Sequence, residues 1–231
     1  MVDESITFDG RTMMNTVTKR FSPEEELANA LSHFTGALLA TAGLVLMVVY
    51  SVLNGNVWHV VSTSIFGFSM LILYTSSTFN HWLKPGKSKE FFFNFDQVAI
   101  FLLIAGTYTP LTLVSIRSGL GWTIFGLEWG LAAIGIIIRL MKPAAFESGV
   151  NRFFILLYAV MGWMLLIGIG TIARAISPMG LAWIFIGGAC YTLGILFYKK
   201  IQFPYHHLVW HLFVMAGSIS HFFAIFFHVI P

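Results

Sequence analysis

The chain has 231 residues, of which 57% are hydrophobic and 10% are charged, with a mean hydropathy of +0.81 and a formal net charge of +3. Because about a quarter of the residues in soluble domains are charged, this balance excludes an ordinary soluble protein and indicates an integral membrane protein. The positive charge does not indicate a nucleic-acid-binding protein, because no basic stripe accompanies it.

The first 21 residues are polar and include Asp3, Glu4, Arg11 and Lys19. They lack the apolar core and the cleavage site of a signal peptide. We therefore expect residues 1–21 to form a polar cytoplasmic N-terminal segment, and residues 22–231 to form one transmembrane domain.

Seven apolar stretches follow, each close to the roughly 20 residues that a helix needs to cross a bilayer. Before the first stretch, Ser22 can cap the helix, Pro23 suits the first helical position and Glu25 completes a capping box. The connections are short and rich in turn-forming residues, so neighbouring helices should run antiparallel. The sequence predicts an all-α, seven-transmembrane helix bundle, with helices at about 24–53, 57–81, 96–114, 121–140, 151–172, 179–198 and 205–229.

The basic residues predict the orientation of this bundle. Of the 13 Lys and Arg residues, all but Arg117 and Arg174 fall in the N-terminal segment or in the second, fourth and sixth loops. Cytoplasmic loops of membrane proteins carry an excess of Lys and Arg. We therefore expect a multi-pass protein of the inner membrane of a bacterial cell, with the N-terminus in the cytoplasm and the C-terminus outside.

Three histidines are expected to reach the same membrane boundary. His207 and His211 open the seventh helix one turn apart, which places both imidazoles on one face. His81 ends the second helix, which runs toward the cytoplasmic boundary from which the seventh begins. Three neutral nitrogen ligands with one open position are the arrangement of a catalytic zinc site. The sequence thus predicts that His81, His207 and His211 bind Zn²⁺.

Two further polar residues are expected at this boundary. Asp96 begins the predicted third helix, and Ser77 lies one turn before His81. A carboxylate can take the proton of a water whose pKa zinc lowers to about 7, so ester or amide hydrolysis is the natural chemistry. Other readings stay open. A His-x-x-x-His pair can arise by coincidence or serve hydrogen bonds between helices, Ser77 can bond to its own helix backbone, and Asp96 can interact with the helix dipole.

Glu26, Asn29 and His33 share a face of the first helix at the same boundary. They are either partners that orient a metal ligand through hydrogen bonds or the hydrated start of a helix.

Two polar residues lie deeper in the predicted membrane. His221 is about 15 Å beyond His211 along the helix, so it is expected to pack or hydrogen-bond across the bundle. Glu128 lies in the outer half of the fourth helix as a weaker functional candidate, between Gly126 and Gly130, whose spacing favours close helix packing.

Four segments together resemble the progestin and adipoQ receptor family, in its bacterial hemolysin III branch. They are "EEELANALSHFTG" (24–36), "SSTFNH" (76–81), Asp96 followed by "IAGTYTP" (104–110), and "HHLVWH" (206–211). The resemblance covers residues 22–231. It implies a zinc site at the cytoplasmic side of seven helices, with His81, His207 and His211 as ligands and with Asp96 and Ser77 acting through water. Asn80 departs from the pattern, which would have an aromatic residue there, and so does the Gln97-Val98 pair after Asp96.

These observations favour a zinc-dependent hydrolase of a lipid amide or ester that enters from the inner leaflet. A membrane lipid is the expected substrate or ligand. The alternative is a non-enzymatic regulator or sensor of membrane lipid homeostasis, in which a structural zinc clamps the second and seventh helices. A cytolysin is the least favoured reading, because sparse charge offers no evident water-filled path.

Overall fold

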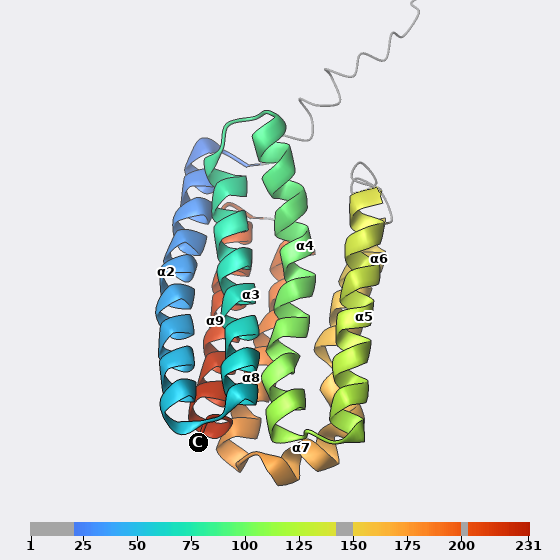
Figure 1. The fold of residues 1–231 in the computed structure, drawn as a ribbon. Coiled ribbons are helices and arrows are strands. Elements are labelled where there is room, and N and C mark those ends of the chain that lie inside the picture. Colours follow the sequence, from blue (N-terminus) through green and yellow to red (C-terminus); the bar gives the residue numbers. More distant parts are fainter. Residues whose placement is uncertain (1–20, 142–149, 200–202) are drawn as a thin grey trace, which may run out of the picture.

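A computed structural model of the protein describes residues 21–141, 150–199 and 203–231 (Figure 1). Within these residues, seven helical spans are long and apolar enough to cross a membrane, as the sequence predicts. The elements are α2 (Pro23–Asn54), α3 (Val57–Trp82), α4 (Lys87–Pro110), the π-helix η1 (Leu111–Ser115), α5 (Gly119–Met141), α6 (Val150–Gly162), the 3₁₀-helix η3 (Met164–Gly168), α7 (Ile169–Ala175), α8 (Pro178–Lys199) and α9 (His206–His228).

The start of α2 is confirmed in detail. The Ser22 hydroxyl accepts from the Glu25 backbone N–H at 3.2 Å, and the Glu25 carboxylate accepts from the Ser22 N–H at 2.9 Å. Glu25 also accepts from the Tyr205 backbone N–H at 2.8 Å. The cap of α2 therefore also fixes the residue that precedes α9.

The predicted start of the third helix at residue 96 is wrong, because α4 begins at Lys87. Residues 87–95 are polar and aromatic, so hydropathy detects only the later, apolar part of the helix. Asp96 consequently lies inside α4 rather than at its first turn, and the helix dipole does not explain its position.

The predicted fifth helix is interrupted. α6 ends at Gly162, and the chain passes through Trp163 and η3 before α7 begins. The Tyr108 hydroxyl of α4 donates to the Gly162 carbonyl at 2.9 Å and accepts from the Leu165 N–H at 2.9 Å. Backbone groups freed by a break inside a membrane need such partners, and here the side chain of another helix supplies them.

α2, α3 and α4 pack in sequence, α9 packs against α2 and α8, and α5 packs against α4 (Figure 1). α4 with η1 is the most buried span and forms the centre of the bundle. Its close approach to α3 needs Gly106, where an added Cβ would lie 2.3 Å from the Ser69 hydroxyl. Central packing of α4 brings its polar face into the interior of the bundle.

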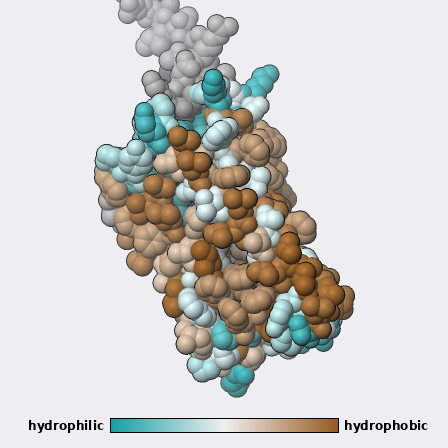
Figure 2. All heavy atoms as spheres, turned by 90° about the vertical axis from the view of Figure 1, so that its left-hand side faces the viewer, coloured by the Kyte–Doolittle hydropathy of each residue, from teal (hydrophilic) through white to brown (hydrophobic). Residues whose placement is uncertain are grey.

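The outer surface is apolar between two polar ends, as Figure 2 shows for the face that includes α2. Large apolar side chains such as Leu38, Leu46 and Val52 are exposed along α2. The close packing predicted at Gly126 and Gly130 is wrong for the described part of the chain, because an added Cβ at either position meets nothing within 4 Å.

The predicted polar segment 1–21 lies outside the described residues, apart from Phe21. The orientation across the membrane remains a prediction from the distribution of Lys and Arg.

Candidate metal centre

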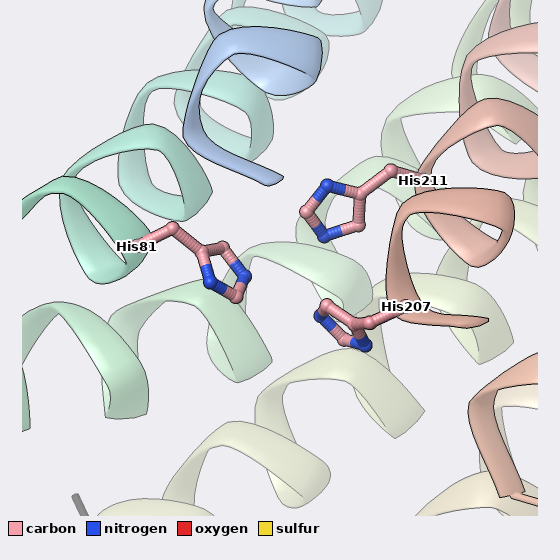
Figure 3. Close-up of side chains that lie close together, drawn as sticks. All are labelled: His81, His207 and His211. Atoms are coloured by element: carbon pink, nitrogen blue, oxygen red, sulfur yellow. The ribbon is translucent and has the colours of Figure 1, made fainter. Parts of the chain in front are cut away.

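The end of α3 meets the starts of α2, α4 and α9 at one end of the bundle, which we call the histidine end (top of Figure 1). There, His81, His207 and His211 each offer one nitrogen, and these three atoms lie within 4.8 Å of one another. Figure 3 shows the three rings turned toward a common space. All three side chains are buried, so the sequence prediction that they come together is confirmed.

The hydrogen bond to His81 decides which of its nitrogens can bind a metal. Its Nδ1 lies 2.6 Å from the Glu26 Oε2 atom of α2. A carboxylate only accepts hydrogen bonds, so Nδ1 carries the hydrogen and donates. In a neutral ring, Nε2 then keeps its lone pair, and this buried atom has no hydrogen-bond partner among the described residues. Lys89 Nζ, at 2.9 Å from Glu26 Oε1, holds the carboxylate from its other side.

A similar argument holds for His211. Its Nδ1 lies 3.2 Å from the Asn29 backbone carbonyl and 2.9 Å from the Ser32 hydroxyl. Since Ser32 Oγ donates to the same carbonyl at 2.7 Å, the ring nitrogen is the donor to both oxygens. The Nε2 atom of His211 is thereby left as the ligand nitrogen.

These residues fit a metal ion on the chemistry of the donors. Two imidazoles are held in one tautomer by partners on α2, and their lone-pair nitrogens converge with His207 in a buried space. Partners of this kind, which fix ligating histidines through their other nitrogen, are typical of metal sites in proteins. The three histidines can therefore hold a metal ion.

The three α2 residues expected near the site have different surroundings. Glu26 bonds to the His81 ring, whereas Asn29 contributes its backbone carbonyl, and its buried side-chain amide has no hydrogen bond among the described residues. His33 stacks on His211, with ring centroids 3.5 Å apart and an angle of 12° between the rings. Both Glu26 and Asn29 thus face a proposed ligand, and His33 packs against one.

Asp96 and Ser77 lie beside the histidines and line a common cavity with His207 and His211. The Asn80 amide donates to Asp96 Oδ2 at 3.1 Å. Asn80, noted in the sequence only as a departure from the family pattern, therefore links α3 to the carboxylate of α4.

The cavity has a volume of about 150 Å³ and mostly apolar walls. From the histidine end it extends along α4 to Tyr108 and reaches Gly162 and Trp163 at the break after α6. A cavity with polar groups at one end and apolar walls beyond them suits an amphipathic molecule.

The remaining candidate residues lie apart from the three histidines. His221 Nε2 lies 3.1 Å from the Ile184 carbonyl of α8, which confirms the expected hydrogen bond across the bundle. Glu128 is fully buried in α5 and is not part of the metal centre.

Sequence reasoning missed Asn80, Ser32 and Lys89. Each acts through a contact with a residue on a different helix, and none forms a spacing pattern with the residue it touches. The only sign of their role in the sequence is that they lie close to residues of the motifs.

Replacing Glu26 by Gln should weaken metal binding by about 10- to 100-fold, because the His81 ring loses the charged acceptor that holds its Nδ1–H. The affinity can be measured by competition with a chromophoric chelator. Glu24→Gln is the matched control, since Glu24 is exposed on the same helix turn. Equal affinities for the Glu26→Gln variant and the unmodified protein would contradict the positioning role of Glu26.

Comparison with known proteins adds to this geometry. Residues 21–222 match a family model described as haemolysin-III related. The chain is 38% identical over 213 residues to the Hemolysin-3 homolog of Bacillus subtilis (strain 168), covering 91% of this chain and 97% of that protein. It is 36% identical over 208 residues to Hemolysin-3 of Bacillus cereus, covering 90% and 93%. It is 28% identical over 222 residues to the human Monocyte to macrophage differentiation factor, covering 89% and 86%.

Proposed function

The chain belongs to the haemolysin-III related family, as its motifs predict, and we propose that it is a zinc-dependent membrane hydrolase of a lipid amide or ester. The observation that carries this proposal is the position of Asp96 and of two of the three histidines at the polar end of an apolar cavity.

Zinc is the metal that we propose for this donor set. Three imidazole nitrogens with an open fourth position are a common catalytic zinc environment. When bound, zinc would supply Lewis-acid chemistry, which polarises a carbonyl and makes a water molecule more acidic. His81, His207 and His211 would hold it.

The residues around the metal centre have distinct roles in this proposal. Asp96 acts as the general base, since one of its carboxylate oxygens can take a proton from the attacking water while Asn80 holds Oδ2. Ser77, on the wall of the same cavity, orients the water or donates to the oxygen on which negative charge develops. The proton that Asp96 accepts is then available to the leaving amine or alcohol.

The cavity supports a lipid substrate. Its walls beyond Asp96 include Leu103, Ile104 and Ile195, which match an acyl chain, and its polar end would place the amide or ester at the histidines. The predicted orientation would put this end at the inner leaflet.

A second function rests on the way the centre joins the helices. His81 of α3, His207 of α9 and, through Glu26, α2 meet at one point, so a metal would clamp three helices. A protein of this design would regulate or sense membrane lipids without turning them over. A cytolytic activity, which the names of the Bacillus relatives mention, has no feature of the described bundle to support it.

Turnover can be tested with the purified full-length protein in lipid nanodiscs that contain an extract of bacterial lipids. We expect mass spectrometry to show release of fatty acid that stops when a chelator removes the metal and resumes when zinc is added back. If the zinc-loaded protein releases no fatty acid from amide- or ester-linked lipids, the hydrolase is refuted and the regulator is favoured.

A further inference from the structure

Glu128 is a buried carboxyl group that the proposed hydrolysis does not use. Its side chain is 0% exposed, and neither carboxylate oxygen has a hydrogen-bond partner among the described residues. The residue lies well inside α5, a helix apolar enough to cross a membrane. Ionisable residues at such positions are costly and commonly functional.

Glu128 lies on the face of α5 that packs against α4 and η1, because added Cβ atoms at Gly121 and Gly135, seven residues to either side of it, would meet Thr112 and Phe101. Tyr108 lies between these two contacts on α4 and is a titratable neighbour of Glu128. The Tyr108 hydroxyl bridges Gly162 and Leu165 at the helix break, and Tyr108 also lines the cavity. Glu128 therefore lies beside the end of the cavity that is remote from the metal centre.

Among the residues that the structure describes, no Lys, Arg or His forms an ion pair or a hydrogen bond with Glu128. On α4, Asp96 is twelve residues from Tyr108, which is about 18 Å along the helix. The other charged residues of α4 lie still nearer the histidine end; they are Lys87, Lys89 and Glu90. On α6, the Tyr158 hydroxyl donates to the Gln97 carbonyl, and Arg152 lies in the first turn. η1 and η3 contain no titratable side chain, and Arg139 of α5 bonds to Asn94 near the histidine end.

An ionised carboxylate in such surroundings would be a buried charge with neither an ion partner nor a hydrogen-bond donor among the described residues, which is energetically unfavourable. A proton removes that charge, whereas a metal cation needs several oxygen ligands. Tyr108 is poorly placed to supply one, because its hydroxyl already donates one hydrogen bond and accepts another.

We propose that Glu128 is a proton-binding site beside the end of the cavity remote from the metal centre, and that it is a neutral carboxylic acid in the folded protein. The site is independent of the hydrolase, because it depends on neither the histidines nor a bound lipid.

Infrared spectroscopy of the full-length protein in lipid bilayers tests this directly. At neutral pH, we expect the carbonyl-stretching band of a protonated carboxyl group in the unmodified protein and its loss in Glu128→Gln. The band should remain in Glu90→Gln, the matched control that neutralises an exposed carboxylate. Spectra in which the Glu128→Gln variant retains the whole band would overturn the proposal.

Thermal unfolding as a function of pH is the second measurement. The Glu128 carboxyl group should lose its proton above about pH 4 in the unfolded chain but keep it in the folded protein. The unmodified protein should therefore lose stability more steeply than Glu128→Gln as pH rises from about 4. Identical pH profiles would overturn the proposal. The proposal would also be overturned if replacing potassium by sodium at neutral pH stabilised the unmodified protein but not Glu128→Gln, since that result would assign a sodium ion to the site. Zinc content should be the same in both proteins, which separates this test from that of the metal centre.

Discussion

Replacement of both His207 and His211 by Ala is expected to abolish metal binding. Only His81 would remain of the three nitrogen donors, and one imidazole cannot hold a zinc ion against solvent. The metal content of the purified protein, measured by elemental analysis, should fall from about one ion per chain to background. His206→Ala is the control, because His206 opens the same helix but bonds to the Phe197 carbonyl and is not among the three converging residues.

The same variants should differ in their response to a chelator. A ligand that binds only the folded state at 1,000 times its dissociation constant stabilises the protein by about 4 kcal/mol. Chelation should therefore lower the unfolding temperature of the unmodified protein and of His206→Ala, and leave the double variant unchanged. Because two alanines could also disturb packing, His207→Gln is a second variant, which removes one ligand with less disturbance of the packing. Full metal content in the double variant would contradict the assigned ligands.

Replacement of Asp96 by Asn is expected to lower lipid turnover by about 10²- to 10⁴-fold, the usual contribution of a general base. Asn has nearly the same shape, so it can still pair with Asn80, but its neutral amide cannot take a proton from water. Turnover of the zinc-loaded variant in nanodiscs, measured by mass spectrometry, gives the size of the effect.

Zinc content and thermal stability of Asp96→Asn should stay near those of the unmodified protein, since the metal ligands are histidines. Glu90→Gln is a matched control, because it removes one negative charge from an exposed position of the same helix. If Asp96→Asn retains full turnover, Asp96 is not the base; if it loses its zinc, Asp96 serves as a ligand instead.

The sequence predicted well which histidines come together, because their signal is local. His207 and His211 are one helical turn apart, and the positions of His81 and His207 at helix ends follow from where the apolar stretches stop. Because successive helices run antiparallel, the end of the second helix and the start of the seventh lie at the same membrane boundary. The capping box of Ser22 and Glu25 is equally local and is found as predicted.

The missed features have two causes, namely contacts between different helices and a weak hydropathy signal. The break after Gly162 is stabilised by a hydrogen bond from Tyr108, a residue 54 positions earlier. The hydropathy of residues 151–172 does not indicate this bond. The early start of α4 was missed because residues 87–95 are too polar for a hydropathy signal. Likewise, the pairing of Asn80 with Asp96 requires that α3 and α4 pack in one register, which the sequence alone does not specify.

X-ray absorption at the zinc edge of the purified, unmodified protein is the most direct test of the metal centre. If His81, His207 and His211 bind zinc, the spectrum should show one zinc per chain with about three imidazole nitrogens and one oxygen at roughly 2.0–2.1 Å. A protein that binds no zinc, or a zinc whose ligands include sulfur or fewer than three imidazoles, would contradict the account.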